Sequence, residues 1–172
     1  VISKCLESLN ADRIIVYDLH AGQIQGFFPN HIPLDNLYVE PYFIKYINNY
    51  ILSEFNNKDL VIVSPDEGAV KNAVRISSKL DCSCATIYKE RKVANKVSKM
   101  TLMGDVKDKV VIIIDDIIDT GGTAIKAAET LNNYGAKKIF LMATHGLLSE
   151  NAAEKVNKSL FDEIIITNTT PY

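Results

Sequence analysis

Short runs rich in valine and isoleucine recur along this chain, and stretches with helical spacing separate most of them. The six runs are residues 13–19, 60–65, 84–90, 110–115, 138–145 and 163–169. The helical patterns between them are residues 42–55, 67–80, 120–135 and 149–160. Nearly continuous apolar strands that alternate with helices are typical of a parallel sheet covered on both faces. The order therefore predicts an α/β fold, a doubly wound parallel sheet flanked by helices.

The overall composition argues against several classes of protein. Of the 172 residues, 47% are hydrophobic, which is enough to bury a core. The formal net charge of −2 leaves no basic field that would recruit nucleic acid or an anionic membrane. No apolar run reaches the length of a membrane span, and no signal-peptide pattern opens the chain. Three cysteines without disulfide spacing indicate a reducing compartment, so we expect a cytoplasmic protein.

Two stretches break the alternation of strands and helices. Residues 29–36, with two prolines among polar side chains, are typical of a segment that crosses between lobes. Residues 91–108 show no clear period and are rich in basic side chains. Loops of this length inside compact domains are usually functional or mobile. We therefore predict a functional basic loop in this stretch.

The end of the run at 110–115 carries the pattern DDIIDTGGT, residues 115–123. Gly121 and Gly122 permit backbone conformations closed to other residues and let the main chain approach a ligand closely. The helix that follows offers unpaired N–H groups at its start, which suit a phosphate. The hydroxyl groups of Thr120 and Thr123 would add further donors. This pattern predicts a phosphate cradle at the carboxyl end of a strand, where ligands of doubly wound sheets bind.

Asp115 and Asp116 stand beside that cradle and cannot bind phosphate directly, because their carboxylates are anionic. They can accept hydrogen bonds from sugar hydroxyls, or hold Mg²⁺ through its waters. A phosphate site next to a diol or metal site describes a ribose phosphate. The alternative is that the aspartates only solvate the strand end and that Thr123 caps the helix. The aspartate pair favours the ribose phosphate.

The stretch VVIIIDDIIDTGGT resembles the phosphoribosyl-diphosphate-binding motif of the class I phosphoribosyltransferase fold. Further segments resemble ribose-phosphate pyrophosphokinases (PRPP synthetases) in the same order: DLHAGQIQGFF, IPLDN, VSPDEGAVKNA, YKERKVANKVSKM and MGDVKDKV. The resemblance covers almost the whole chain. It implies a type I phosphoribosyltransferase-like fold and a transferase of nucleotide biosynthesis. Such an enzyme moves the diphosphoryl group of MgATP to the 1-hydroxyl of ribose 5-phosphate, giving PRPP and AMP.

The resemblance also assigns roles to individual residues. Lys89 and Arg91 would stabilise the transition state, where the migrating phosphoryl groups accumulate negative charge. His20 would help to bind MgATP. The predicted ribose 5-phosphate site is Asp115, Asp116, Asp119, Thr120, Gly121, Gly122 and Thr123. The predicted pyrophosphate loop is Asp66, Glu67, Gly68 and Ala69, and the predicted Mg²⁺ ligands are Asp18, His20 and Asp66. From the residues alone, the alternatives are a solvated basic loop and a structural histidine.

The pyrophosphate loop departs from the family pattern. The family commonly has a small residue followed by two glycines after the aspartate, whereas this chain has Glu67, Gly68 and Ala69. Glu67 brings negative charge near a diphosphate site, which is unfavourable unless Mg²⁺ or a lysine screens it. We expect metal to compensate, because His20, Lys89 and Arg91 are all present. The alternatives are a non-catalytic regulatory relative, which Glu67 favours, and a base phosphoribosyltransferase, whose nucleobase-binding hood we do not find.

The resemblance further implies a domain organisation and an assembly. Residues 1–36 resemble the truncated end of an N-terminal phosphoribosyltransferase-like domain, and residues 37–172 most of the C-terminal one. The chain opens without methionine in a helical pattern, so we expect part of a longer protein, inactive or slow as an isolated fragment. The family self-associates as dimers stacked into hexamers, with inorganic phosphate as an activator. Gln25, Asp35 and Asn36 match positions near its regulatory anion site.

Overall fold

A computed structural model describes residues 1–90 and 99–171 of the chain, in which six strands form one sheet and two strands form another. Along the larger sheet the order is β5 (Lys99–Met103), β4 (Ser83–Glu90), β3 (Leu60–Ser64), β6 (Val110–Ile118), β7 (Lys138–Gly146) and β8 (Glu163–Ile166). All neighbouring pairs are parallel except β4 and β5, which are antiparallel. The predicted α/β sheet, wound in both directions from its centre, is confirmed.

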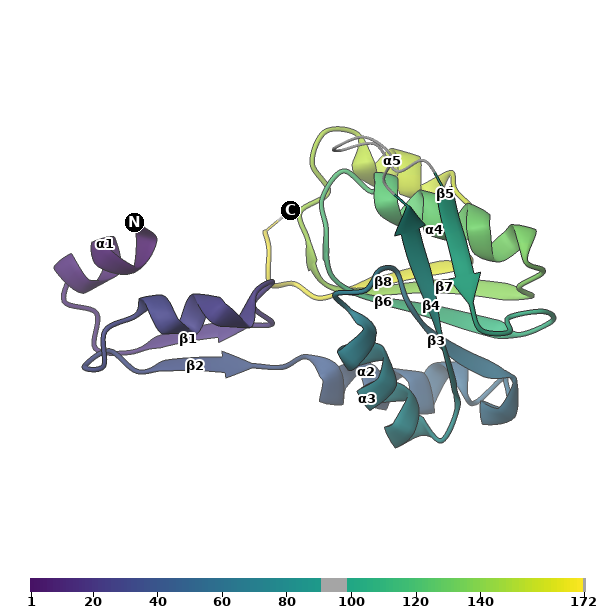
Figure 1. Cartoon of the computed structure of the whole chain (residues 1–172), viewed down its shortest axis with the longest axis horizontal. Coiled ribbons are helices and arrows are strands. Elements are labelled where there is room, and N and C mark those ends of the chain that lie inside the picture. Colours follow the sequence, from purple (N-terminus) through teal and green to yellow (C-terminus); the bar gives the residue numbers. More distant parts are fainter. Residues whose placement is uncertain (91–98, 172) are drawn as a thin grey trace.

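Helices cover both faces of the larger sheet (Figure 1). On one face lie α2 (Glu40–Tyr46), its π-helical continuation η2 (Ile47–Ile51) and α3 (Val70–Leu80), and on the other lie α4 (Gly122–Asn133) and α5 (Ala152–Asn157). A short 3-10 turn, η3 (Asn57–Asp59), leads into β3. None of the helices in the described ranges is long and apolar enough to cross a membrane.

Alternation along the strands divides the buried side chains between two cores. Ile62 and Ile112 pack with α2 and α3, whereas Val61 and Val111 pack with α4 and α5. The buried residues of α3 recur every three to four positions, so they lie on one face of the helix. The buried face of α4 consists mainly of alanines, which let this helix lie close to the sheet. This burial on both faces explains why the central strands are apolar throughout.

The central strand β6 is longer than the sequence predicts. The run at 110–115 was expected to end at Asp115, but β6 continues to Ile118. The neighbouring strand β7 causes the extension, because pairing continues to Ile118 opposite Gly146. Asp115 and Asp116 therefore lie inside the strand, three and two residues before its last residue.

Residues 1–36, which we call the arm, extend to one side of the larger sheet (Figure 1). Its parallel pair, β1 (Ile14–Tyr17) and β2 (Leu34–Leu37, whose last residue lies just past the arm), is accompanied by α1 (Ile2–Ser8) and the 3-10 helix η1 (Gly22–Phe27). The expectation of a crossing segment at 29–36 missed β2, because LDNL lacks an apolar alternation and is ordered by its pairing with β1. All residues of the arm are described, and Ile32 alone is buried.

The stretch predicted as a basic loop also contains a strand. Residues 99–103 form β5, which pairs antiparallel with β4 from Thr86 opposite Met103 to Glu90 opposite Lys99. The prediction of a loop over all of 91–108 is therefore wrong at residues 99–103. The strand is hard to detect from sequence because it lies at the sheet edge, where Leu102 is the only buried side chain between residues 100 and 103.

Candidate active site

The neighbouring strands β3 and β6 mark the point where the chain reverses its direction of travel across the sheet. The helix after β3 lies on one face and the helix after β6 on the other, which opens a crevice outside the carboxyl ends of these strands. The pyrophosphate loop follows β3, and DDIIDTGGT spans the end of β6. The sheet topology thus brings two of the predicted site segments to one edge.

The DTGGT loop has the backbone that its glycines predict. Gly121 has φ 74°, and a Cβ atom there would lie 2.6 Å from Cγ2 of Val156, so a side chain does not fit. Gly121 is the N-cap of α4, and no side chain caps this fully described helix. The alternative that Thr123 caps the helix is therefore wrong. The side chains of Asp119, Thr120 and Thr123 are exposed around the first turn, whose amides have no intrahelical acceptor.

The aspartate pair carries an unfavourable charge. Burial of Asp115 and the adjacent charge of Asp116 raise the pKa of Asp115 to about 7. The Oδ1 atom of Asp115 accepts a hydrogen bond from the N–H of Asp116 at 2.9 Å, which holds the carboxylate in place. A cation or several hydroxyl donors at this position would favour the ionised form. The pair is therefore suited to a ligand with hydroxyl groups or a bound cation.

His20 reaches this pair from the arm, 96 residues away in sequence. Its Nδ1 atom lies 2.6 Å from Oδ2 of Asp116. The hydrogen bond to Asp116 and the charge of that carboxylate raise the pKa of His20. The imidazole is 79% exposed, so a ligand can reach it from solvent.

The pyrophosphate loop is ordered by Asp66. Its Oδ1 atom accepts the N–H groups of Gly68 at 3.0 Å and Ala69 at 3.2 Å, and its Oδ2 atom lies 3.0 Å from Nζ of Lys89. Burial would raise the pKa of Asp66, but the hydrogen bond and charge of Lys89 outweigh it and lower the pKa. The side chain of Lys89 is only 8% exposed, whereas Glu67 is exposed to solvent. The structure thus joins Asp66 and Lys89, two residues that the sequence analysis placed in separate roles.

Other predicted site residues make local contacts. Oδ2 of Asp18 accepts the N–H of Val39 and the hydroxyl of Thr144. The predicted regulatory residues are also engaged: Gln25 donates to the carbonyl of Gly22, Asp35 pairs with Arg13, and Asn36 accepts the N–H of Leu19. Arg91 lies outside the described residues. Within the described ranges, no group of three or more His, Cys, Asp or Glu side chains is arranged to hold a metal ion.

A buried carboxylate beside this edge escaped the sequence analysis. Glu40 opens α2, is 7% exposed, and pairs with Nε of Arg75 and with Nζ of Lys79 at 2.5 Å. Burial would raise the pKa of Glu40, but these two cations lower it. The cluster links the start of α2 to α3, whose first turn follows the pyrophosphate loop. No motif signals it, because Glu40 lies 35 and 39 residues away from its two partners in sequence.

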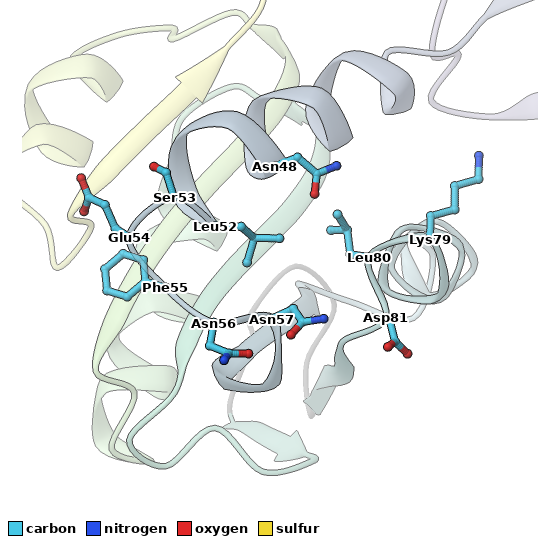
Figure 2. Close-up of a pocket in the computed structure, with 10 residues that line it drawn as sticks. All are labelled: Asn48, Leu52, Ser53, Glu54, Phe55, Asn56, Asn57, Lys79, Leu80 and Asp81. Atoms are coloured by element: carbon cyan, nitrogen blue, oxygen red, sulfur yellow. The ribbon is translucent and has the colours of Figure 1, made fainter.

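Two hollows are lined by described residues. A narrow crevice at the site is lined by Asp18, Asn72, Arg75, Asp115, Asp116 and Thr144, among others. An open hollow lies at the opposite edge of the sheet, near the amino ends of β3 and β4 (Figure 2). Its lining includes Asn48, Leu52, Asn57 and Asp81, and none of the predicted site residues. The open hollow therefore lies away from the described residues of the predicted site.

The chain is similar to known proteins along its whole length. Residues 91–172 match the family described as phosphoribosyl synthetase-associated domain. Over 172 residues, the chain is 53% identical to Ribose-phosphate pyrophosphokinase A of Dictyostelium discoideum, covering all of this chain and 52% of that protein. The solved phosphoribosylpyrophosphate synthetase from Mycobacterium smegmatis is 37% identical, with a TM-score of 0.88 over 99% of this chain and 53% of that one. The chain spans about half the length of the curated relatives it matches.

More distant solved structures identify the fold. A purine phosphoribosyltransferase from Pyrococcus horikoshii superposes with a TM-score of 0.52 over 90% of this chain and 87% of that one. At 22% sequence identity this likeness concerns the fold alone. The fold is therefore type I phosphoribosyltransferase-like, as the resemblance of the strand ends implied.

Proposed function

We propose that the protein works as a ribose-phosphate pyrophosphokinase, because this chain matches such enzymes along its whole length. The enzyme would transfer the diphosphoryl group of MgATP to the 1-hydroxyl of ribose 5-phosphate, giving PRPP and AMP. One observation carries the proposal beyond the fold: His20 from the arm contacts Asp116, which lies at the same sheet edge as the Asp66–Lys89 pair. Because the chain spans about half the length of these relatives, this activity is proposed for the whole protein.

Ribose 5-phosphate would bind at the end of β6. Its phosphate would meet the first-turn amides of α4 and the hydroxyls of Thr120 and Thr123. Its ring hydroxyls would donate hydrogen bonds to Asp115 and Asp116. An ionised carboxylate accepts hydrogen bonds and cannot donate them. The raised pKa of Asp115 supports this assignment, because hydroxyl donors would offset the burial of its charge.

Lys89 would stabilise the transferring group. The 1-hydroxyl oxygen attacks the β-phosphorus of ATP and loses its proton. The bond between the β-phosphorus and the oxygen that bridges it to the α-phosphorus breaks. AMP leaves with this bridging oxygen. Negative charge develops on the transferring phosphoryl oxygens, and a fixed ammonium group stabilises it. Asp66 holds that ammonium group at the end of β4. The role of Arg91, which lies outside the described residues, stays a prediction.

The acidic side chains at this edge have the chemistry that Mg²⁺ prefers, although in the described residues they are not gathered into a three-ligand cluster. Asp66, Asp115 and Asp116 offer the carboxylate oxygens that this ion prefers, and the raised pKa of Asp115 indicates charge that a cation would balance. When bound, Mg²⁺ would neutralise phosphate oxygens of ATP and screen Glu67 from the diphosphate. Asp18, His20 and Asp66 remain the predicted ligands.

The remaining features rest on the resemblance. We infer self-association as dimers and hexamers, activation by inorganic phosphate near Gln25, Asp35 and Asn36, and a cytoplasmic location. A non-catalytic regulatory relative is the second candidate function, and Glu67 is the observation that favours it. The exposure of Glu67 weakens that case, because solvent screens its charge.

The decisive experiment uses the full-length protein with MgATP, ribose 5-phosphate and inorganic phosphate. We expect AMP and PRPP to form in equal amounts, and chromatography measures both products. Binding of ribose 5-phosphate without AMP formation would favour the regulatory relative instead. Absence of both would contradict the proposed site.

A further inference from the structure

The carboxylate of Asp18 joins three segments of the chain. Its Oδ2 atom accepts the N–H of Val39 at 3.1 Å and the hydroxyl of Thr144 at 2.7 Å, while its own N–H donates to the carbonyl of Leu37 at 2.8 Å. Asp18 also has φ 40°, a left-handed conformation that non-glycine residues adopt only where surrounding contacts hold it. Thr144 is 1% exposed, so its hydroxyl has no access to water as an alternative partner. The end of β1 is therefore held in a defined position against the end of β7.

His145 makes a second contact with the same part of the arm. Its Nε2 atom lies 3.0 Å from the carbonyl oxygen of Tyr17, and its Nδ1 atom lies 2.8 Å from Oγ1 of Thr169. A carbonyl can only accept, so Nε2 carries a proton and donates it to Tyr17. The imidazole therefore bridges the arm and the segment after β8.

These contacts lie beside the third link between arm and sheet, that of His20. In the pairing of β6 with β7, Asp115 lies opposite Ala143 and Ile117 opposite His145. Thr144 therefore occupies the strand position next to Asp116, the partner of His20. Tyr17, Asp18 and His20 of the arm thus contact adjacent positions on two neighbouring strands, whereas the N–H of Leu19 donates to Asn36 within the arm.

We propose that Asp18, Thr144 and His145 form a clasp that positions His20 against Asp116. The proposal rests on the proposed function, in which His20 helps to bind MgATP. Apolar packing cannot provide this positioning, because Ile32 is the only buried residue of the fully described arm and the His20 side chain is largely exposed. The direction in which His20 projects is set by its backbone, and the clasp holds that backbone two residues earlier. Thr144 and His145 are positioning residues, because they act through their contacts with Asp18 and Tyr17 of the arm.

The first test removes the hydroxyl of Thr144 in the full-length protein. Thr144→Val keeps the shape of the side chain. We expect kcat/KM for MgATP to fall about tenfold, because a small displacement of His20 from its binding position is enough for such a loss. The affinity for ribose 5-phosphate should stay unchanged, and Thr144→Ser should restore activity. Thr130→Val is the matched control, because it removes a hydroxyl bonded to the carbonyl of Lys126 on α4, away from the site.

A double-mutant comparison separates positioning from general destabilisation. If Thr144 acts through His20, Thr144→Val should have no further effect in a His20→Ala background. An equal loss in both backgrounds would overturn the clasp as a device for His20. His145 provides an independent pair of variants: Gln can still donate from its amide to Tyr17, whereas Asn is too short, so only His145→Asn should lower kcat/KM.

Amide hydrogen exchange tests the clasp without reference to activity. In the wild-type protein the amides of Asp18, Leu19 and Val39 each donate a hydrogen bond near the clasp. Thr144→Val and His145→Asn should both speed their exchange, whereas Thr130→Val should not. Faster exchange in a protein that makes no PRPP would overturn the proposed function and keep the clasp. Unchanged exchange in both variants would overturn the clasp, whatever the activity.

Discussion

The arm and the larger sheet are held together by different forces. In the sheet, β6 and β7 are nine residues long, and most of their residues are buried. In the arm, β1 and β2 have four residues each, with intermediate to exposed side chains. Apolar burial therefore stabilises the sheet, while the arm depends on hydrogen bonds at its junction with β6 and β7. The comparison teaches that the candidate site is assembled where the weakly packed region meets the strongly packed one.

The same comparison explains which charged groups the protein can place at the site. The rigid sheet holds Asp115 and Lys89 in half-buried or buried positions, at a cost in solvation of their charges. The arm contributes His20, an exposed group that needs direction more than burial. The following predictions test this division, from the largest expected effect to the smallest.

The largest effect should follow from a cavity in the sheet. Leu141 in β7 is fully buried, and Leu141→Ala should lower the free energy of unfolding by about 2–5 kcal/mol, because it removes apolar contacts and leaves a void. Urea denaturation of the full-length protein measures the loss. A change no larger than that of an exposed leucine would refute the view that this sheet is the main source of stability.

The next effect concerns catalysis rather than stability. Lys89→Ala should lower kcat about 100- to 1,000-fold, because a fixed positive charge at the transferring phosphoryl group is lost. The dissociation constant for ribose 5-phosphate, measured by calorimetry, should change little. Lys158→Ala, which breaks an exposed pair with Glu154, is the control for loss of a lysine charge. Turnover like that of the wild type in Lys89→Ala would reject the assigned role.

A smaller effect should appear when the charge of Asp115 is removed. Asp115 keeps its proton to about pH 7 in the folded state, whereas its ordinary pKa is 3.8, so the unfolded state loses the proton first. Stability therefore falls as pH rises between these two values and stays low above them. Asp115→Asn should raise the free energy of unfolding by about 1–3 kcal/mol above about pH 8 and have almost no effect below about pH 3.

Thermal or urea unfolding across this pH range measures the difference between Asp115→Asn and the wild type. The asparagine oxygen can still accept the N–H of Asp116, so the comparison isolates the charge. If the difference in unfolding free energy between the two proteins does not vary with pH, the charge of the Asp115 carboxylate does not destabilise the folded state. The variant should also bind ribose 5-phosphate more weakly, because an ionised acceptor is lost.

The smallest effect is expected in the arm. Leu9 follows α1 and is 77% exposed, so Leu9→Ala should change the free energy of unfolding by no more than about 0.5 kcal/mol. The measurement is the same urea titration used for Leu141→Ala, which makes the two values directly comparable. A loss as large as in the sheet would mean that Leu9 is buried in the full-length protein.

Agreement between sequence and structure is best where local patterns and tertiary burial require the same residues. β3 and β7 follow the predicted runs closely, because strands buried on both faces must be apolar throughout. The helix predicted at 42–55 forms only as far as Tyr46 in α-helical geometry and continues as a π-helical turn, a change of hydrogen bonding that periodicity does not signal. The edge strands β2 and β5 were missed, because pairing with a neighbour orders them and side-chain burial does not.

Much of the candidate site was also legible in the sequence. The glycines and aspartates of DDIIDTGGT carry their own chemical meaning, and Gly121 has the left-handed backbone that only a glycine fits here. Contacts such as His20 with Asp116 and Lys89 with Asp66 were not predicted, since each joins residues from separate segments. The buried Glu40 cluster left no signal at all for the same reason.

The sequence by itself determined the alternation of strands and helices, and with it the doubly wound sheet whose carboxyl edge carries the candidate site. It also determined the chemical groups available there, because residue type and local backbone freedom are encoded within a few positions. Only the tertiary structure decided which groups meet. Strand order brings β3 beside β6, and the pairing of β6 with β7 places Thr144 next to Asp116. The physical reason is that contact between distant segments depends on sheet register and on the docking of the arm, which no local pattern specifies.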